Sequence, residues 1–309
     1  MSNATKDFPF VSVIIPVFNN SKLLSKCLKA LENQSYPTQK IEIIVVDNAS
    51  TEKISEVTNN FSRVTLAYEE KPGSYAARNT GIKLSNGTIL AFTDSDCIPD
   101  IDWIEKGVKA LIDFPNCGLV AGKIELFYLQ PDRPNAIEFY DCIAYLNQQK
   151  YVKDGNFGAT ANMFTFAQRF QEVGLFNSSL NSGGDKEWGG RISLLGLEAI
   201  FAEDAVVKHP ARSSVRQLQN KCLRVVGGLY YLDRIGSVDE QARPRNKELI
   251  QEVFHRLKPP VSYLRWRLSD SRLKGIGQKL TFIFITVYMD YSIAWEIIRL
   301  RLGGTAKRL

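Results

Sequence analysis

Short apolar runs alternate, over the first hundred residues, with segments that carry an apolar stripe at helical spacing. The runs Val11–Val17 and Ile41–Asp47 are rich in β-branched residues, which is typical of buried strands. The same criteria predict two further strands and two helices, over Val64–Ala67, Thr88–Thr93, 21–33 and 73–84. This alternation predicts an α/β fold in which a doubly wound, mostly parallel sheet has helices on both faces.

Polar clusters follow three of the predicted strands. They are Phe18-Asn19-Asn20, Asp47-Asn48 and Asp94-Ser95-Asp96. Ligands of such sheets bind beyond the carboxyl ends of the strands, so we expect these clusters to converge on one site. No Gly-x-Gly-x-x-Gly follows the first strand and no P-loop sequence occurs. The usual dinucleotide fold is therefore not expected, and a P-loop is excluded.

Asp94 and Asp96 end an apolar strand and are separated by one residue. Side chains at positions i and i+2 of a strand point the same way. Two adjacent carboxylates repel each other unless a cation lies between them. One interpretation is therefore a Mg²⁺ or Mn²⁺ site that also holds phosphate oxygens. The alternative is a solvated turn or the N-cap of a following helix.

A glycine-rich segment, 181–191, contains a second group of acids, Asp185 and Glu187, before an apolar helical stripe. A carboxylate at a helix N-terminus stays ionised, which suits a general base. The alternative is a capped helix after a glycine turn. His209 is one of only two histidines, and its alternatives are a metal ligand or an ordinary packed side chain.

The composition is that of a globular protein, with 44% apolar and 23% charged residues. Five cysteines without a Cys-x-x-Cys spacing favour a reducing compartment over a disulfide framework. The first apolar run, Val11–Val17, contains Pro16 and is too short for a signal peptide or a membrane span. We therefore expect a cytoplasmic protein.

The charge is unevenly distributed, because residues 1–205 carry −6 and residues 206–309 carry +12. Residues 211–309 show helical stripes, and the apolar run 280–289 covers about half a bilayer before Asp290 and Glu296 interrupt it. We expect an amphipathic helix on anionic cytoplasmic lipid. The alternatives are a packed helical cap and a homodimer surface. Nucleic acid is not expected as a partner, because the aromatic residues lie among aliphatic ones.

A series of segments between residues 9 and 210 resembles, in order and spacing, glycosyltransferase family 2. The segments are 11–19 (VSVIIPVFN), 44–50 (IVVDNAS), 73–81 (GSYAARNTG), 92–96 (FTDSD), 159–163 (ATANM), 170–177 (FQEVGLFN) and 184–188 (GDKEW). The resemblance implies a GT-A catalytic domain over 1–210, with a nucleotide-sugar half at about 9–100 and an acceptor half at about 101–210. The basic helical region 211–309 is not covered by it.

The resemblance also implies an activity. Enzymes of this family transfer a sugar, with inversion, from a nucleotide-sugar to a hydroxyl group, and some act in polysaccharide biosynthesis. A UDP-sugar donor, a glycan or lipid-linked acceptor and a Mn²⁺ or Mg²⁺ cofactor are the corresponding expectations for this chain. The remaining alternatives are a non-catalytic nucleotide-sugar-binding or scaffold protein of the same fold, and a nucleotidyltransferase.

Residue roles follow from the same resemblance. Asp185 would be the general base, with Glu187 as a substitute, because Gly184 stands where many relatives have a glutamate. Asp96 would bind the metal with Asp94 and His209, while Asn162 and Trp188 would lie at the donor sugar or the acceptor. The implied nucleotide-sugar contacts are Pro16, Phe18, Asn19, Asp47, Ser50, Arg78, Asp94 and Ser95.

Overall fold

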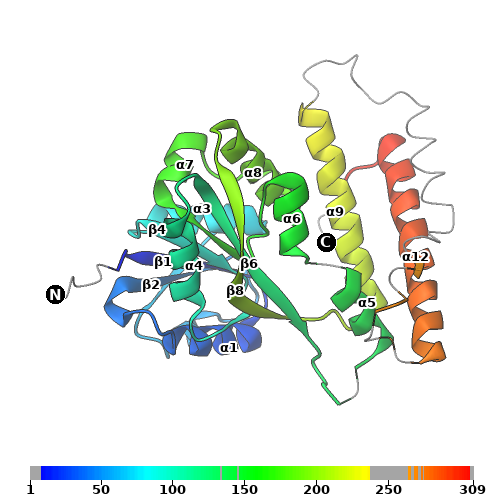
Figure 1. Ribbon diagram of the computed structural model, residues 1–309, viewed down its shortest axis with the longest axis horizontal. Helices are drawn as coiled ribbons and strands as arrows, with labels where there is room; N and C mark the ends of the chain where they lie inside the picture. The colour runs from blue at the N-terminus through cyan, green and yellow to red at the C-terminus, as the bar shows by residue number, and fades with distance from the viewer. Residues whose placement is uncertain are drawn as a thin grey trace. The chain divides into compact units, whose positions relative to one another are not determined.

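The computed structural model describes residues 8–132, 134–144, 146–236, 264–265, 268–270, 273 and 275–306 (Figure 1). Two compact units make up the chain. The first consists of residues 1–125, 146–179 and 184–209, and the second of residues 126–145, 180–183 and 210–309.

An eight-stranded sheet forms the centre of the first unit, with the strand order β3-β2-β1-β4-β7-β6-β8-β5. The strands β1 to β4 run parallel, whereas β7 pairs antiparallel with β4 and β6. The predicted parallel sheet of the first hundred residues is thus present. The strands are β1 (Val11–Val17), β2 (Ile41–Asp47), β3 (Val64–Tyr68), β4 (Ile89–Thr93), β5 (Ile98–Pro99), β6 (Cys117–Phe127), β7 (Asn162–Phe166) and β8 (Glu198–Pro210).

Helices cover both faces of this sheet because successive strand residues point to opposite sides. On one face, α1 (Ser21–Glu32), α2 (Ser55–Thr58) and α4 (Trp103–Asp113) pack on alternate residues of the strands, such as Val13 and Ile43. On the other face, α3 (Ser74–Leu84) packs on Ile44 and Val46. Phe92, in register with Ile14 and hence with Ile44, contacts Phe170 of α7 (Ala167–Val173). The remaining elements of this unit are a 3₁₀ turn, Thr38–Lys40, α6 (Gln148–Gly155) and α8 (Gly184–Leu194).

The second unit contains three described helices, α5 (Ala136–Ala144), α9 (Val215–Gly236) and α12 (Ile276–Arg301). They share an apolar core in which α12 contributes Phe282, Ile285 and Met289. Helix α12 contacts both α5 and α9 (Figure 1). Pro259-Pro260, a pair expected from the sequence to break the helical pattern of residues 211–309, lies outside the described residues.

Helix α12 extends beyond the apolar run 280–289 at both ends and comprises 26 residues, Ile276–Arg301. Glu296 does not end it, because its buried carboxylate accepts hydrogen bonds from Arg299 at 2.6 and 2.8 Å. By length and composition alone this helix could cross a membrane, a test that a core helix of a soluble protein also passes.

Candidate active site

The loops after β1 and β2 hold each other in place at the carboxyl edge of the sheet. The backbone N–H of Asn19 donates to Ser50 Oγ at 2.9 Å, and Asn19 Oδ1 accepts from the backbone N–H of Thr51 at 2.7 Å. Asp47 Oδ1 accepts from the backbone N–H of Ser50 at 2.9 Å. Asn19 has a φ of 48°, a left-handed conformation that asparagine tolerates better than most residues. The structure therefore brings together the predicted residues Asn19, Asp47 and Ser50.

Phe18 and Pro16 differ in accessibility. The Phe18 side chain is 61% exposed beyond the end of β1, which leaves its ring available to a ligand. Pro16 is buried within the strand. Of these two predicted nucleotide-sugar contacts, only the Phe18 side chain is accessible.

Asn48 belongs to the polar cluster after β2, although no specific role was predicted for it, and it joins the end of β2 to the start of α3. Its Nδ2 donates to the carbonyls of Glu69 and Lys71 at 2.9 and 2.8 Å, and its Oδ1 accepts from the backbone N–H of Gly73 at 2.7 Å. Gly73 has a φ of 126°, a conformation that favours glycine. An asparagine directly after a buried strand was the available sequence signal.

Asp94 forms an ion pair with Arg78 of α3, whose side chain is only 4% exposed. The neighbouring Ser95 hydroxyl accepts a 3.2 Å hydrogen bond from Asn20, which ties the β4 end to the β1 loop. The positive charge of Arg78 offsets the charge of Asp94, so the two carboxylates after β4 are not equivalent. Asp94 is paired with Arg78, whereas Asp96 lies near Cys97 and His209.

Asp96 lies beside His209, with 3.7 Å between Asp96 Oδ2 and His209 Nε2. The pairing of β5 with β8 causes this contact, because Ile98 is in register with Lys208. The donor atoms of Asp96, Cys97 and His209 lie within 4.8 Å of one another. Burial, together with the charges of Asp94 and Asp96, raises the pKa of the Cys97 thiol well above its usual range, so the thiol stays neutral.

This donor set fits a divalent cation that accepts oxygen and nitrogen ligands. A carboxylate and an imidazole suit Mn²⁺, and oxygen ligands suit Mg²⁺. The predicted metal residues Asp96 and His209 are thus adjacent, and Asp94 is two residues from Asp96 in the chain.

Asp185 is the second acid at the site, and it lies in the first turn of α8. Its Oδ1 accepts a 2.7 Å hydrogen bond from the Tyr75 hydroxyl, and its Oδ2 accepts a 3.3 Å bond from the backbone N–H of Thr160. The same hydroxyl accepts from the backbone N–H of Gly184 at 2.9 Å. Burial and the Asp185 charge raise the pKa of Tyr75 well above its usual range, so the hydroxyl keeps the proton that it donates.

Glu187 is engaged in a different contact. Its Oε2 lies 2.9 Å from Arg191 Nη2, one turn along α8. Arg191 also donates to the carbonyls of Val173, Gly174 and Leu175, which fixes the loop after α7. Glu187 is thus held by a salt bridge within its own helix, whereas Asp185 is held by the Tyr75 hydroxyl and a backbone N–H.

Asn162 and Trp188, which were expected at the donor sugar or the acceptor, are both buried side chains. Asn162 is fully buried; its Nδ2 donates to the carbonyls of Lys123 and Ala205, both at 2.8 Å, and its Oδ1 accepts from Trp103 at 2.8 Å. Trp188 is also fully buried, stacks on Phe170 at 4.5 Å, and donates to the Gly174 carbonyl.

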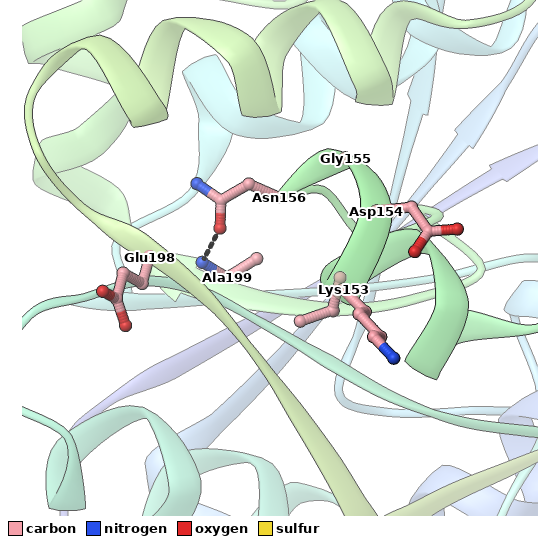
Figure 2. A pocket seen from close by; sticks show the side chains of 7 residues that line it. Lys153, Asp154, Gly155, Asn156, Glu198 and Ala199 are labelled. Atoms are coloured by element: carbon pink, nitrogen blue, oxygen red, sulfur yellow. Dashed lines mark hydrogen bonds between the residues drawn. The ribbon is translucent and has the colours of Figure 1, made fainter.

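A separate open hollow of about 500 Å³ lies at the end of α6 and the start of β8 (Figure 2). Asn156 Oδ1 accepts a 2.6 Å hydrogen bond there from the backbone N–H of Ala199. Strand β8 runs from this hollow, at Glu198, to His209, roughly 35 Å away at the rise of a strand. None of the predicted site residues lines the hollow, so it is not part of the candidate active site.

The ordered strand-end residues and motifs correspond to a known family. The family model described as "Glycosyl transferase family 2" matches residues 12–173. The chain belongs to glycosyltransferase family 2. It is therefore an enzyme that transfers glycosyl groups, as the sequence motifs predicted, and the nucleotidyltransferase alternative is set aside.

Relatives and solved structures of glycosyltransferases agree with this assignment. Glycosyltransferase AglE of Haloferax volcanii is 40% identical over 239 residues, which cover 75% of this chain and 77% of AglE. A Methanococcus voltae protein, dolichyl N-acetyl-alpha-D-glucosaminyl phosphate 3-beta-D-2,3-diacetamido-2,3-dideoxy-beta-D-glucuronosyltransferase, is 26% identical over 67% of this chain and 69% of its own length.

The GT-A fold predicted for this family 2 enzyme is confirmed by its similarity to a solved structure. Mannosyltransferase PcManGT from Pyrobaculum calidifontis, in complex with GDP-Man and Mn²⁺, superimposes with a TM-score of 0.63. The two chains are 19% identical, and the match covers 95% of this chain and 87% of PcManGT. At that identity the likeness shows the fold alone.

Proposed function

We propose that this enzyme transfers a sugar from a nucleotide-sugar to a hydroxyl group of a glycan or lipid-linked acceptor, with inversion at the anomeric carbon and with help from a divalent cation. The main support for this proposal is a connection that α3 makes between two groups of acids. Tyr75 and Arg78 lie three residues apart on α3, with the guanidinium 5.8 Å from the centre of the phenol ring. Tyr75 holds Asp185 and Arg78 holds Asp94, so one helical turn connects the candidate base to the strand-end carboxylates.

The donor would lie over the carboxyl ends of β1, β2 and β4. Phe18 presents an exposed ring for the base, and Asp47, positioned by Ser50, is available to uracil or ribose. A UDP-sugar is our first choice of donor. The structurally similar PcManGT was solved with GDP-Man, so GDP-sugars are the necessary comparison in any donor screen.

A Mn²⁺ or Mg²⁺ ion would be held by Asp96 and His209, with Asp94 nearby. When bound, it would offset the negative charge that develops on the departing nucleoside diphosphate. The Mn²⁺ in the PcManGT complex and the donor set of this chain both support the proposal.

The proton transfer would belong to Asp185. Its carboxylate accepts the proton of the acceptor hydroxyl while that oxygen bonds to the anomeric carbon. The bond from this carbon to the diphosphate oxygen breaks, and its electron pair leaves with the nucleoside diphosphate. Because the acceptor enters opposite the leaving group, the configuration inverts, as in an inverting glycosidase with the acceptor in place of water.

A lipid-linked acceptor is supported by the Methanococcus voltae relative, whose name specifies a dolichyl N-acetylglucosaminyl phosphate. A role in polysaccharide or glycan assembly would be consistent with such an acceptor. Cytoplasmic placement and a homodimer are predictions of the sequence that we retain as proposals.

The proposal is tested by nucleoside diphosphate release and by titration calorimetry of the donor. Asp185→Asn should reduce transfer by about 10²- to 10⁴-fold while donor binding stays close to that of the wild type. Glu187→Gln is the matched control and should retain more activity. Asp96→Ala should abolish the Mn²⁺ dependence of donor binding.

Two results would contradict these assignments. Near-normal transfer by Asp185→Asn would show that Asp185 is not the general base. Unchanged Mn²⁺-dependent binding of the donor by Asp96→Ala would show that Asp96 is not a metal ligand. Donor binding without any transfer or hydrolysis by the wild type would instead support the non-catalytic alternative.

A further inference from the structure

Helix α12 exposes an unusual row of large apolar side chains. Ile276, Leu280, Phe284, Tyr288, Tyr291 and Trp295 are between 37% and 79% exposed. Their spacing of three or four residues places them on one side of the helix, which we call the outer face of α12. The row is about 28 Å long at the rise of an α-helix. Isolated exposed apolar residues are ordinary, but a continuous row of this length indicates a binding surface.

The opposite side of α12 packs within the second unit. Phe282, Ile285 and Met289 are buried against α5 and α9 in the core of the second unit. Helix α12 is therefore apolar on two sides, and packing among the described residues of its unit accounts for only one of them. This differs from the simple amphipathic helix that the sequence predicts.

Electrostatics favours an anionic bilayer over a second copy of the chain as the occupant. Residues 206–309 carry a net charge of +12. Two copies joined through α12 would bring two such basic regions together, which like-charge repulsion disfavours. Anionic lipid headgroups would instead attract them, at about 1 kcal/mol for each lysine or arginine near the surface.

The side chains on the outer face also suit the surface of a bilayer. Tyr288, Tyr291 and Trp295 cluster in the C-terminal half of the row, and such rings prefer the boundary between headgroups and acyl chains. A membrane-spanning arrangement would place Asp290 and the Glu296–Arg299 ion pair in hydrocarbon, which is costly. It would also separate the helix from its packed partners, α5 and α9.

We infer that the outer face of α12 rests in the plane of an anionic membrane, with the six apolar side chains inserted among the lipids. This inference does not depend on the proposed chemistry. It concerns a surface of the second unit, whereas the candidate active-site residues belong to the first.

Flotation of the full-length chain with lipid vesicles tests the inference. Vesicles of phosphatidylcholine alone are compared with vesicles that contain phosphatidylglycerol as well. The wild type should float with the anionic vesicles and bind the neutral ones at least tenfold less. The triple variant Leu280→Gln, Phe284→Gln, Trp295→Gln should bind anionic vesicles at least about tenfold more weakly than the wild type. The reason is that three apolar side chains are no longer transferred from water into the lipid.

The matched control replaces three equally exposed apolar residues of the first unit, Ile101→Gln, Ile112→Gln and Leu194→Gln. It should float like the wild type. Circular dichroism establishes that each variant is folded, and light scattering during gel filtration gives its mass. Absence of wild-type flotation, or equal flotation of the two triple variants, would overturn the inference. A wild-type dimer that only the α12 substitutions dissociate, without lipid binding, would assign the outer face to a second copy instead.

Discussion

The Tyr75 hydroxyl contacts two neighbouring residues that are distant from it in sequence. It donates to Asp185 and accepts from the backbone N–H of Gly184, about 110 residues further along the chain. Such a hydroxyl can fix both the position and the orientation of a carboxylate. We therefore regard Tyr75 as a positioning residue for the proposed base.

Tyr75→Phe removes this hydroxyl and leaves the ring, so we expect kcat to fall about tenfold or more, as for a hydrogen bond to a charged group. The KM for the donor should change little, because Tyr75 contacts the base and not the strand-end loops. Steady-state kinetics with varied donor and acceptor would measure both quantities.

Tyr36→Phe is a matched control for this variant, since the buried Tyr36 hydroxyl donates to the Pro9 carbonyl at 2.7 Å, away from the candidate base. A loss of activity of equal size in both variants would show that Tyr75 acts only through stability.

The side chains that define the site could be predicted from sequence only in part. Asp47, Asp94 and Asp96 follow recognisable strands, and parallel topology brings strand ends together, so their convergence was predictable. The contacts of Tyr75 and Asn48 were not, because their partners belong to other segments of the chain. The full burial of Asn162 and Trp188 also depends on packing that a single sequence does not display.

At the scale of elements, a buried charge cluster links α5 to α9 in the second unit. Asp141 of α5 is fully buried and lies 3.1 Å from Arg212 Nη1 and 3.9 Å from Lys221 Nζ of α9. Burial, reinforced by the charge of Arg212, lowers the pKa of Lys221 to about 7 in spite of the opposing effect of Asp141.

This pKa predicts how stability depends on pH. The unfolded chain, with a lysine pKa near 10.5, binds the Lys221 proton more tightly than the folded chain between about pH 7 and 10.5. The free energy of unfolding should therefore rise with pH across this range, by a few kcal/mol at most, and the contribution should be lost as the pH falls toward 7.

Lys221→Met should flatten this dependence and make the chain more stable than the wild type at pH 6. Urea unfolding of both proteins at pH 6, 7.5 and 9 would show the difference, with the exposed Lys53→Met as a control of equal charge change. Identical slopes for all three proteins would contradict the lowered pKa.

The elements themselves were largely predictable where a local pattern determines them. The β-branched runs predicted the bounds of β1 and β2 correctly, and the apolar stripe predicted the bounds of α1 to within one residue. The bounds of α12 were not predicted, because the apolar run 280–289 covers only part of this 26-residue helix. Glu296 lies within the helix and is paired with Arg299 one turn along it.

At the scale of the whole molecule, the chain combines two units with different chemistry. The first unit carries the strand-end acids, the Asp96–His209 pair and the base candidate, and it has the GT-A fold. The second carries the buried charge cluster and the outer face of α12. The acidic and basic halves of the sequence correspond broadly to this division, which supports separate roles in chemistry and attachment.

The stereochemistry of the product is the most direct test of inverting transfer with Asp185 as the general base, because it reports the face from which the acceptor attacks. Proton NMR of the first product formed from an α-linked nucleotide-sugar would give the anomeric configuration of the new linkage. With Asp185 as a base opposite the leaving diphosphate, the product should be the β-glycoside. An α-glycoside as the first product would contradict the account.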